Sequence, residues 1–416
     1  MGVQVWFLWN GTDVSMKVLQ INCVYGKGST GKITQDIHRE LQKRGIDSLV
    51  CYGRGKTVRE QGVYKICGEL YAKCNNLLSR FTGLMYGGCF FSTNRLIQMI
   101  RKEKPDVVHL QCLNGYFVNI YRLVTWLKKR GMKTVLTLHA EFMYTGNCGY
   151  ALDCDRWMNG CGYCPRLRRE TKSLFLDGTA RSFGKMQRAF AEFDENLTVV
   201  SVSPWLKERA ERSPMLKGKH HCVLFNGVDT EIFHPYDTED LRKKHGLTNE
   251  KILFHATSFF SDDPEHIKGG YYILRLAEIL SNQNVKIIVA GDHEAGLQIP
   301  ENMIFLGSIQ DQKELARYYS MADVTVLTSK KETFSMITAE SLCCGTPVAG
   351  FEAGGPEQIA LPEFSGFVQW GDIWKLSAEV KTLLEVKKSD IITAECSARV
   401  YSKNTMAEGY MALYAN

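Results

Sequence analysis

Residues 324–340 read VTVLTSKKETFSMITAE, and this stretch decides the fold. A β-branched run, Val324–Leu327, is followed within a few polar residues by a helical pattern over 335–344. The same change from a short strand to a longer amphipathic stretch recurs along the chain, which is typical of a parallel sheet with crossover helices. The sequence therefore predicts an α/β protein.

Two series of strands follow one another along the chain. The first series has predicted strands at Lys17–Cys23, Ser48–Cys51, Asp106–Leu110, Thr134–Leu138 and Leu197–Ser201, with helices at 31–44, 92–103 and 117–130. The second starts near Cys222 and continues with strands at Ile252–Ala256, Lys286–Ala290, Met303–Leu306, Val324–Leu327 and Pro347–Phe351, with helices at 269–281, 311–320 and 335–344. Each series predicts one doubly wound, Rossmann-like parallel-sheet domain.

Turn residues and strand patterns predict the domain boundaries. Residues 1–15 are an N-terminal extension, because Met16 precedes a more typical first strand. The first domain spans 16–210, the second spans 211–395, and residues 396–416 form a C-terminal helix that packs back on the first domain. Two such domains that face each other leave a cleft at the carboxyl ends of their strands, where open α/β sheets bind ligands.

The composition excludes several classes of protein. Hydrophobic residues make up 44% of the 416 and charged residues 23%, so the chain has the composition of a core-forming protein and not of a disordered one. Its net charge of +6 comes without the concentrated basic run of a dedicated nucleic-acid binder. The 14 Cys lie mostly singly in apolar segments, and no run of 18 apolar residues occurs. We therefore expect a cytoplasmic protein with reduced thiols, no membrane span and no nucleic-acid partner.

Two acidic residues mark the helix that follows Val324–Leu327. Glu332 and Glu340 would lie about 12 Å apart on a continuous helix, which matches the span of a nucleoside diphosphate sugar. In this interpretation Glu332 lies near the sugar, the amides of Thr333, Phe334 and Ser335 bind the diphosphate, and Glu340 binds the ribose. Their spacing alone favours two solvated helix carboxylates.

The wider pattern is more specific. Glu332 and Glu340 match an E-x7-E signature, and the chain also carries PDVVHL at 105–110, HAE at 139–141 and NGVDTEIFHP at 226–235. From about Lys17 to the C-terminus it resembles the retaining GT-B glycosyltransferases of family 4. The resemblance implies two Rossmann-like domains, a donor-sugar contact for Glu332 and a ribose contact for Glu340. Thr333 and Ser335 replace the glycines of the usual E-G-F-G.

A Lys-Gly pair lies before a predicted helix of the second domain, in HIKGG at 266–270. The resemblance implies that Lys268 binds the donor phosphate, where a cation stabilises the charge that grows as the sugar leaves. The family's accompanying Arg is not evident here. Oxygen atoms of Thr257 or Ser258, or the ring of His266, are the candidates for its place.

The first predicted strand is followed by GKGSTGK at 26–32. This matches the P-loop pattern, but Ile33 stands where a P-loop needs Ser or Thr to bind Mg²⁺. The resemblance offers a second interpretation, a Gly-rich loop that closes over the diphosphate or the acceptor. Gly28 and Gly31 would allow such a close backbone approach.

His139 ends the apolar strand Thr134–Leu138, at the edge where ligands bind in this class of sheet. A structural His is equally typical there. The resemblance implies that His139 touches the donor sugar or its phosphate. Ala140 replaces the Asp of the family's His-Asp pair, so the role of that Asp is lost or passes to Glu141.

Four Cys lie close together within the predicted loop 140–170: Cys148, Cys154, Cys161 and Cys164. Their number and the closing C-x2-C fit a structural Zn²⁺, while free thiols and disulfides are the alternatives. The resemblance extends to a subgroup of polysaccharide biosynthesis enzymes with a similar Cys-rich loop. The D-x-D pattern at 153–155 lies inside this loop and not after a strand, so we interpret it as coincidence and expect catalysis without a metal ion or other cofactor.

An amphipathic segment, Tyr71–Arg101, mixes exposed-type cations with Leu and Phe. It fits either peripheral contact with a membrane or lipid-linked acceptor, or a helical pair packed into the core. The resemblance as a whole implies a hexosyltransferase that moves a sugar from a UDP- or GDP-sugar to a hydroxyl of a glycan or lipid-linked acceptor. We expect this in surface polysaccharide biosynthesis, at the inner face of the cytoplasmic membrane. The alternatives are a P-loop-like ATPase module and a zinc-pinned interaction protein without transferase activity.

Overall fold

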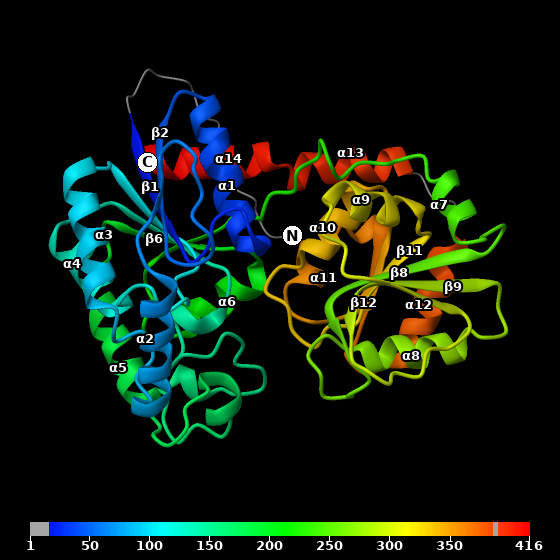
Figure 1. Ribbon diagram of the computed structural model, residues 1–416, viewed down its shortest axis with the longest axis horizontal. Helices are drawn as coiled ribbons and strands as arrows, with labels where there is room; N and C mark the ends of the chain where they lie inside the picture. The colour runs from blue at the N-terminus through cyan, green and yellow to red at the C-terminus, as the bar shows by residue number, and fades with distance from the viewer. Residues whose placement is uncertain (1–15, 386–389) are drawn as a thin grey trace. The chain divides into compact units, whose positions relative to one another are not determined.

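The computed structural model describes residues 16–385 and 390–416, so the predicted extension at 1–15 lies outside the described residues. The chain divides into two compact units (Figure 1). The first ends at Phe225 and also takes in Met406–Asn416, and the second spans Asn226–Thr405.

The first unit is built on a seven-stranded parallel sheet in the order β3-β2-β1-β4-β5-β6-β7. Its strands are β1 (Lys17–Asn22), β2 (Asp47–Tyr52), β3 (Val63–Lys65), β4 (Val107–Leu110), β5 (Thr134–Leu138), β6 (Leu197–Ser201) and β7 (His220–Val223). Its helices are α1 (Gly28–Lys43), α2 (Glu69–Thr82), α3 (Phe90–Glu103), α4 (Ile120–Lys129), α5 (Thr179–Phe190) and α6 (Pro204–Arg212), with short turns η1 (Glu141–Met143), η2 (Arg156–Met158) and η3 (Leu167–Thr171). β4 and β5 are buried along their whole length, and their sequences are mostly apolar without a strict apolar–polar alternation.

The second unit has a six-stranded parallel sheet in the order β10-β9-β8-β11-β12-β13. Its strands are β8 (Lys251–Phe260), β9 (Val285–His293), β10 (Met303–Gly307), β11 (Val324–Leu327), β12 (Val348–Phe351) and β13 (Ser365–Val368). Its helices are α7 (Glu239–Lys244), α8 (Gly270–Ile279), α9 (Gln312–Met321), α10 (Met336–Cys343), α11 (Pro356–Ile359), α12 (Ile373–Glu385) and α13 (Asp390–Tyr401), with the short turn η4 (Pro362–Phe364). The predicted class, two Rossmann-like parallel-sheet domains, is confirmed.

The sequence predicted that the strand near Cys222 begins the second sheet. This prediction is wrong, because the strand belongs to the first sheet. β7 pairs with β6 in parallel register, from Thr198 opposite His220 to Ser201 opposite Val223. The division between the units therefore follows β7, after Phe225, and not residue 210. The strand pattern missed this because it shows where strands lie along the chain but not which neighbour each strand pairs with.

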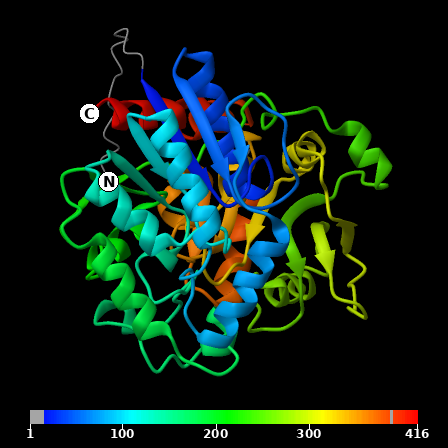
Figure 2. The ribbon, with the colours of Figure 1, turned by 60° about the vertical axis from the view of Figure 1, so that its left-hand side comes forward.

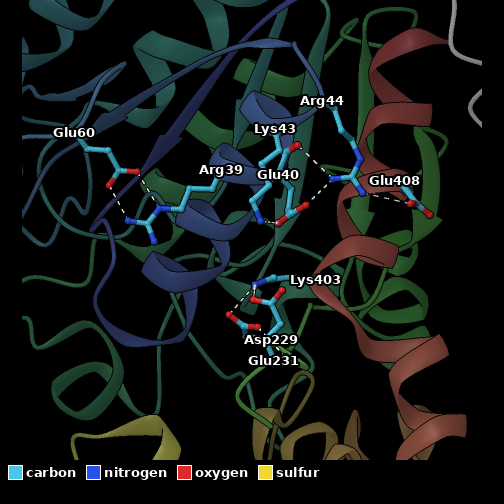
Figure 3. A network of polar contacts seen from close by, with 9 residues as sticks. All are labelled: Arg39, Glu40, Lys43, Arg44, Glu60, Asp229, Glu231, Lys403 and Glu408. Atoms are coloured by element: carbon cyan, nitrogen blue, oxygen red, sulfur yellow. Dashed lines mark hydrogen bonds and ion pairs between the residues drawn. The ribbon is translucent and has the colours of Figure 1, made fainter. Parts of the chain in front are cut away.

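The C-terminal segment forms two helices and not one. α13 ends at Tyr401, and α14 (Lys403–Ala415) begins two residues later. Between them Ser402 forms a bridge with Val228, whose N–H donates to Tyr401 O at 2.6 Å and whose carbonyl accepts from Lys403 N at 2.9 Å. In the same unit Lys403 Nζ lies 2.8 Å from Asp229 Oδ2 (Figure 3).

From Met406 onward, α14 belongs to the first unit, where it runs beside α1 (Figures 1 and 2). Arg44, directly after α1, donates to Glu40 at 2.6 Å and to Glu408 of α14 at 3.3 Å (Figure 3). Lys133 Nζ donates to Tyr414 O at 2.7 Å. These contacts attach the end of the chain to the first sheet and its helices.

Candidate active site

In both sheets the strand order reverses at the first strand of the series, which lies next to β4 in the first unit and next to β11 in the second. Ligands of doubly wound sheets bind outside the carboxyl ends of the strands at such a point. The predicted site residues follow the strands around each of these positions. In the second unit Lys268 follows β8 and Glu332 follows β11, and in the first unit Gly28 follows β1 and His139 follows β5.

Lys268 and Glu332 form an ion pair at the carboxyl edge of the second sheet. Lys268 Nζ donates to Glu332 Oε1 at 2.6 Å, and the two side chains are 29% and 13% exposed. The backbone holds Lys268 in place, because its carbonyl accepts from Thr328 Oγ1 at 3.3 Å. Gly269 has φ +68°, and a Cβ there would meet Thr328 O at 2.1 Å, so this position requires glycine.

Glu332 lies outside α10, in a short bridge with Gly354. Its N–H donates to Ala353 O at 3.0 Å, and its carbonyl accepts from Gly355 N at 2.9 Å. The continuous helix from Glu332 to Glu340, on which the 12 Å spacing depended, is not formed, since α10 begins only at Met336. The extended backbone at Glu332 fixes its carboxylate against the strand ends.

Glu357 supports this bridge and was not among the predicted site residues. Its carboxylate accepts from Ala353 N at 3.0 Å and from Gly354 N at 2.8 Å. The Pro at the start of α11 and the glycines before it were visible in the sequence. Gly and Pro in this order are typical of a turn, but a local pattern does not show that an acid binds the turn's amides.

Thr333, Phe334 and Ser335 are buried between Glu332 and α10. Ser335 has φ +86°, a left-handed value that favours glycine. It also caps α10, because its Oγ accepts from Thr338 N at 3.2 Å. The first turn of a helix presents N–H groups and the positive end of its dipole, so this cap stands at an edge suited to a phosphate.

Glu340 lies one turn and a half into α10 and is half-buried. Its Oε2 accepts from Tyr319 Oη at 3.3 Å. Tyr319 on α9 is fully buried, and desolvation followed by the neighbouring Glu340 charge raises its pKa well above the ordinary value. The phenol therefore stays protonated and orients the carboxylate as a hydrogen-bond donor.

The three candidates to replace the missing Arg differ in their exposure and in their hydrogen bonds. The Thr257 hydroxyl donates to Phe259 O at 3.0 Å, inside a bulge of β8 between Ala256 and Phe259. Ser258 is exposed. His266 is half-buried, and among residues 16–385 and 390–416 no hydrogen-bond partner contacts its Nδ1. His266 thus offers an unused polar atom two residues before Lys268.

The Gly-rich segment of the first unit does not have the form of a P-loop. α1 begins at Gly28, so residues 28–31 are helical and do not form a loop around a phosphate. Gly26 and Gly28 both have φ +65°. A Cβ at Gly31 would meet Val24 Cγ2 at 3.0 Å and Gly26 N at 3.3 Å, which explains glycine at that position.

His139 is half-buried directly after β5, and its ring belongs to a hydrogen-bond network with the side-chain amides of two glutamines. Its Nε2 lies 3.3 Å from Gln111 Oε1, and Gln111 Nε2 donates to Gln20 Oε1 at 2.7 Å. Burial lowers the pKa of His139 to about 4, so the ring is neutral near pH 7. The two glutamines were not predicted, because neither belongs to a recognisable motif.

Glu141 does not take over the role of the missing Asp. Its side chain is 1% exposed, and its Oε1 accepts from Arg209 Nε at 2.6 Å and from Tyr144 Oη at 2.8 Å. Its Oε2 accepts from Ala151 N at 2.6 Å. Because both carboxylate oxygens bind neighbouring groups of the first unit, Glu141 is a structural residue.

The four loop Cys line one cavity of about 20 Å³ together with Trp157 and Thr179. All four are half-buried free thiols. Burial raises the pKa of Cys161 to about 11 and raises those of Cys148 and Cys164, with smaller contributions from the neighbouring loop thiols. Within the described ranges no three His, Cys, Asp or Glu side chains are arranged so that they would hold a metal ion.

Two family models match this chain, and together they span most of it. The model described as Glycosyltransferase Family 4 matches residues 30–232, and the model described as Glycosyl transferases group 1 matches residues 237–394. The chain belongs to glycosyltransferase family 4. The two matches meet close to the division between the units of this glycosyltransferase.

Individual relatives agree with this assignment. The enzyme is 24% identical to WcaC of Escherichia coli K12, a candidate colanic acid biosynthesis glycosyl transferase, over 96% of this chain and 100% of that protein. The sucrose-phosphate synthase of Thermosynechococcus elongatus matches with a TM-score of 0.66 at 15% identity, covering 96% of this chain and 98% of that one. Anabaena Alr3699/HepE, in complex with UDP and glucose, matches with a TM-score of 0.61 at 16% identity, covering 95% and 98%. The fold of this glycosyltransferase is therefore GT-B.

Proposed function

We propose that the enzyme is a retaining, metal-independent hexosyltransferase that moves a sugar from a UDP- or GDP-sugar to a hydroxyl of a glycan or lipid-linked acceptor. The observation that carries the proposal is the Lys268–Glu332 pair at the start of α10. A cation and a sugar-binding acid are held together beside a helix N-terminus, which suits the diphosphate and the sugar of one donor.

In the proposed reaction the bond between the anomeric carbon and the diphosphate breaks on the face where the acceptor oxygen attacks. The acceptor proton passes to the departing phosphate oxygen, and the configuration is retained. Lys268 and the first turn of α10 stabilise the negative charge that grows on the phosphate. Glu332 orients the sugar, and Glu340, oriented by Tyr319, accepts from the ribose hydroxyls.

The other predicted site residues take supporting roles in this proposal. Thr333, Phe334 and Ser335 shape the backbone around the diphosphate, and His266 offers Nδ1 where the family's Arg is missing. His139, as a neutral imidazole, has one donor and one acceptor for a donor-sugar contact. Gly28 and Gly31 keep the start of α1 narrow enough for a close approach by substrate.

Two similar proteins support a class of donor and a biosynthetic pathway for this enzyme. The UDP and glucose bound by Anabaena HepE support a UDP-sugar as the first donor to test. The name of WcaC, which gives colanic acid biosynthesis, supports an acceptor in surface polysaccharide biosynthesis. We propose that the enzyme acts in the cytoplasm, at the inner face of the membrane. We propose that GDP-sugars are the second donor class to test.

The P-loop alternative is the weaker proposal, because α1 already begins at Gly28, within the segment that would have to wrap around a phosphate, and Ile33 replaces the Ser or Thr that binds Mg²⁺. The third interpretation, an interaction protein without transferase activity, makes the opposite prediction about donor turnover. One experiment separates all three: release of UDP or GDP from a panel of nucleotide sugars, for the wild type, Glu332→Gln and Lys32→Ala. We expect release that Glu332→Gln abolishes and Lys32→Ala leaves unchanged. ATP hydrolysis lost in Lys32→Ala, or no turnover of any donor, would reject the proposal.

We also propose that the four loop Cys bind a structural Zn²⁺. The cavity that they share holds about one water-sized particle, and its surrounding loop contains only short helical turns. A thiolate-bound zinc would stabilise such a loop by crosslinking it, at Zn–S distances of about 2.3 Å. The thiols of the metal-free arrangement would have to lose protons and draw together. Elemental analysis of the purified protein tests this, and a zinc content near zero would favour free thiols.

A further inference from the structure

The first unit carries an exposed apolar surface that the transfer reaction does not use. Leu77, Leu78 and Phe81 on α2 are 52%, 57% and 47% exposed, and Phe91 on α3 is 79% exposed. We call the whole set the α2 face, and its members are Leu70, Leu77, Leu78, Phe81, Phe90, Phe91, Phe175 and Leu176. The interpretation of this segment as a core-packed helical pair is therefore wrong for these side chains. Large apolar groups gathered on a surface mark an interaction site.

Ring contacts join the parts of this face. At the start of α2, Tyr71 lies 6.0 Å from Phe91 of α3, measured between ring centroids. At its end, Phe81 stacks on Phe175 at 6.0 Å, and both ribbon views show that end of α2 beside the loop after η3 (Figures 1 and 2). Since Leu70 and Phe81 are 11 residues apart on α2, the apolar surface runs about 16 Å along this helix.

Exposed cations lie on the same segments as the apolar side chains. Four of them are Lys73, Arg95, Arg168 and Lys172. The nearby acids are already bound within the unit. Asp177 accepts from Cys164 N at 2.6 Å, Glu170 pairs with Arg166, and Glu69 pairs with Arg54. The α2 face therefore combines exposed apolar side chains with exposed cations of the same segments.

We propose that the α2 face docks on the surface of an anionic phospholipid bilayer. Leu and Phe side chains enter the boundary between headgroups and acyl chains, and the exposed Lys and Arg of the same segments bind the anionic headgroups. A second copy fits less well, because a two-fold pairing would bring the same cations of both copies together. None of the described helices is long and apolar enough to cross a membrane, so this contact would be peripheral.

The size of the effect follows from the chemistry of each residue. Each exposed cation near an anionic surface contributes roughly a fivefold increase in binding. Each Leu or Phe that leaves water contributes roughly tenfold or more. Several such contributions together give binding that depends strongly on anionic lipid and weakens as salt rises.

The test is co-sedimentation of the full chain with vesicles of phosphatidylcholine alone or mixed with phosphatidylglycerol. We expect binding to the mixed vesicles, weakened by sodium chloride, and a loss of tenfold or more for Leu78→Ser and for Phe91→Ser. Lys172→Gln should weaken binding about fivefold on mixed vesicles only. Ile392→Ser and Trp374→Ser are matched controls, because these side chains are 57% and 69% exposed in the second unit.

Several outcomes would overturn the proposal. One is no binding to either vesicle, and another is equal loss in the control variants. A third is a dimer, seen by light scattering, that Phe91→Ser converts to monomer while vesicle binding is absent, which would assign the face to a second copy. Donor turnover in solution should be unchanged in all these variants, so failure of the membrane contact is distinguishable from failure of the proposed transfer.

Discussion

Lys268 and Glu332 lie 64 positions apart in the chain, yet their charged atoms are 2.6 Å apart. Both side chains keep some contact with solvent, at 29% and 13% exposure, so the pair contributes about 1 kcal/mol or less to stability. The main role of the Lys268–Glu332 pair is to hold a cation and an acid at the place where a donor would bind. We therefore predict that Lys268→Ala lowers the rate of donor turnover by a hundredfold or more while the protein stays folded.

The measurement is the release of nucleoside diphosphate under saturating donor, with the melting temperature as the check on folding. Lys375→Ala is the matched control, since Lys375 also pairs with an acid, Asp372, at 3.0 Å in the same unit. Equal turnover by wild type and Lys268→Ala would show that the pair is only structural.

Ser335 combines a strained backbone with a helix cap, and the two effects can be separated. Ser335→Gly removes the strain of φ +86° and loses a cap that glycine replaces at a cost of a few tenths of a kcal/mol. Ser335→Ala keeps the strain and loses the cap. We predict that the Gly variant is at least as stable as the wild type, and that the Ala variant is less stable by about 1 kcal/mol.

Denaturant unfolding followed on the second unit, for example through a probe near Trp370, checks this order. If both variants lose the same stability, the left-handed backbone of Ser335 does not strain the protein.

His109 makes the first unit sensitive to acid. It is fully buried, its Nδ1 lies 2.7 Å from Tyr414 Oη, and its Nε2 lies 2.8 Å from Thr137 Oγ1. Desolvation, and to a lesser degree His139, lowers its pKa from 6.5 to about 3. The unfolded chain takes up this proton below about pH 6.5, but the folded chain does so only near pH 3. The stability tied to His109 is therefore complete above pH 6.5 and is lost as the pH falls toward 3.

Between pH 7 and pH 5 this loss amounts to about 2 kcal/mol for one such His. We predict that His109→Gln, which does not titrate, loses less stability over the same interval than the wild type. Unfolding curves at the two pH values measure the difference. A loss of the same size in both proteins would assign the acid sensitivity to other groups.

The proposed zinc site predicts a second, separate response to acid. Zinc binds thiolates, and burial already raises the pKa of Cys161 to about 11, so protons compete strongly with the metal. We predict that bound zinc is released as the pH is lowered, and that Cys161→Ser reduces the zinc content and the melting temperature. A colorimetric zinc indicator follows the release.

Cys396→Ser is the control for this experiment, because Cys396 is a half-buried free thiol outside the loop. Zinc that stays bound in Cys161→Ser, or that is lost equally in Cys396→Ser, would contradict the site.

Much of the fold could be predicted from local pattern. Val324–Leu327 and Thr134–Leu138 were predicted with the bounds that β11 and β5 have, because short runs of β-branched and apolar residues between polar segments are typical of buried parallel strands. The short strand β3, Val63–Lys65, was missed, since three residues at a sheet edge carry no periodic signal. The sheet to which β7 belongs was also wrong, because pairing depends on residues far away in the chain.

The candidate site divides in the same way. The sequence by itself determined which residues follow the strand ends, because the alternation of strands and helices in a parallel sheet brings every strand's carboxyl end to one edge. Only the tertiary structure decided that Lys268 pairs with Glu332 and that Glu141 pairs with Arg209. It also decided that Leu78 and Phe91 are exposed to solvent. Periodicity marks an apolar face of a helix, but whether that face is buried depends on whether another element packs against it.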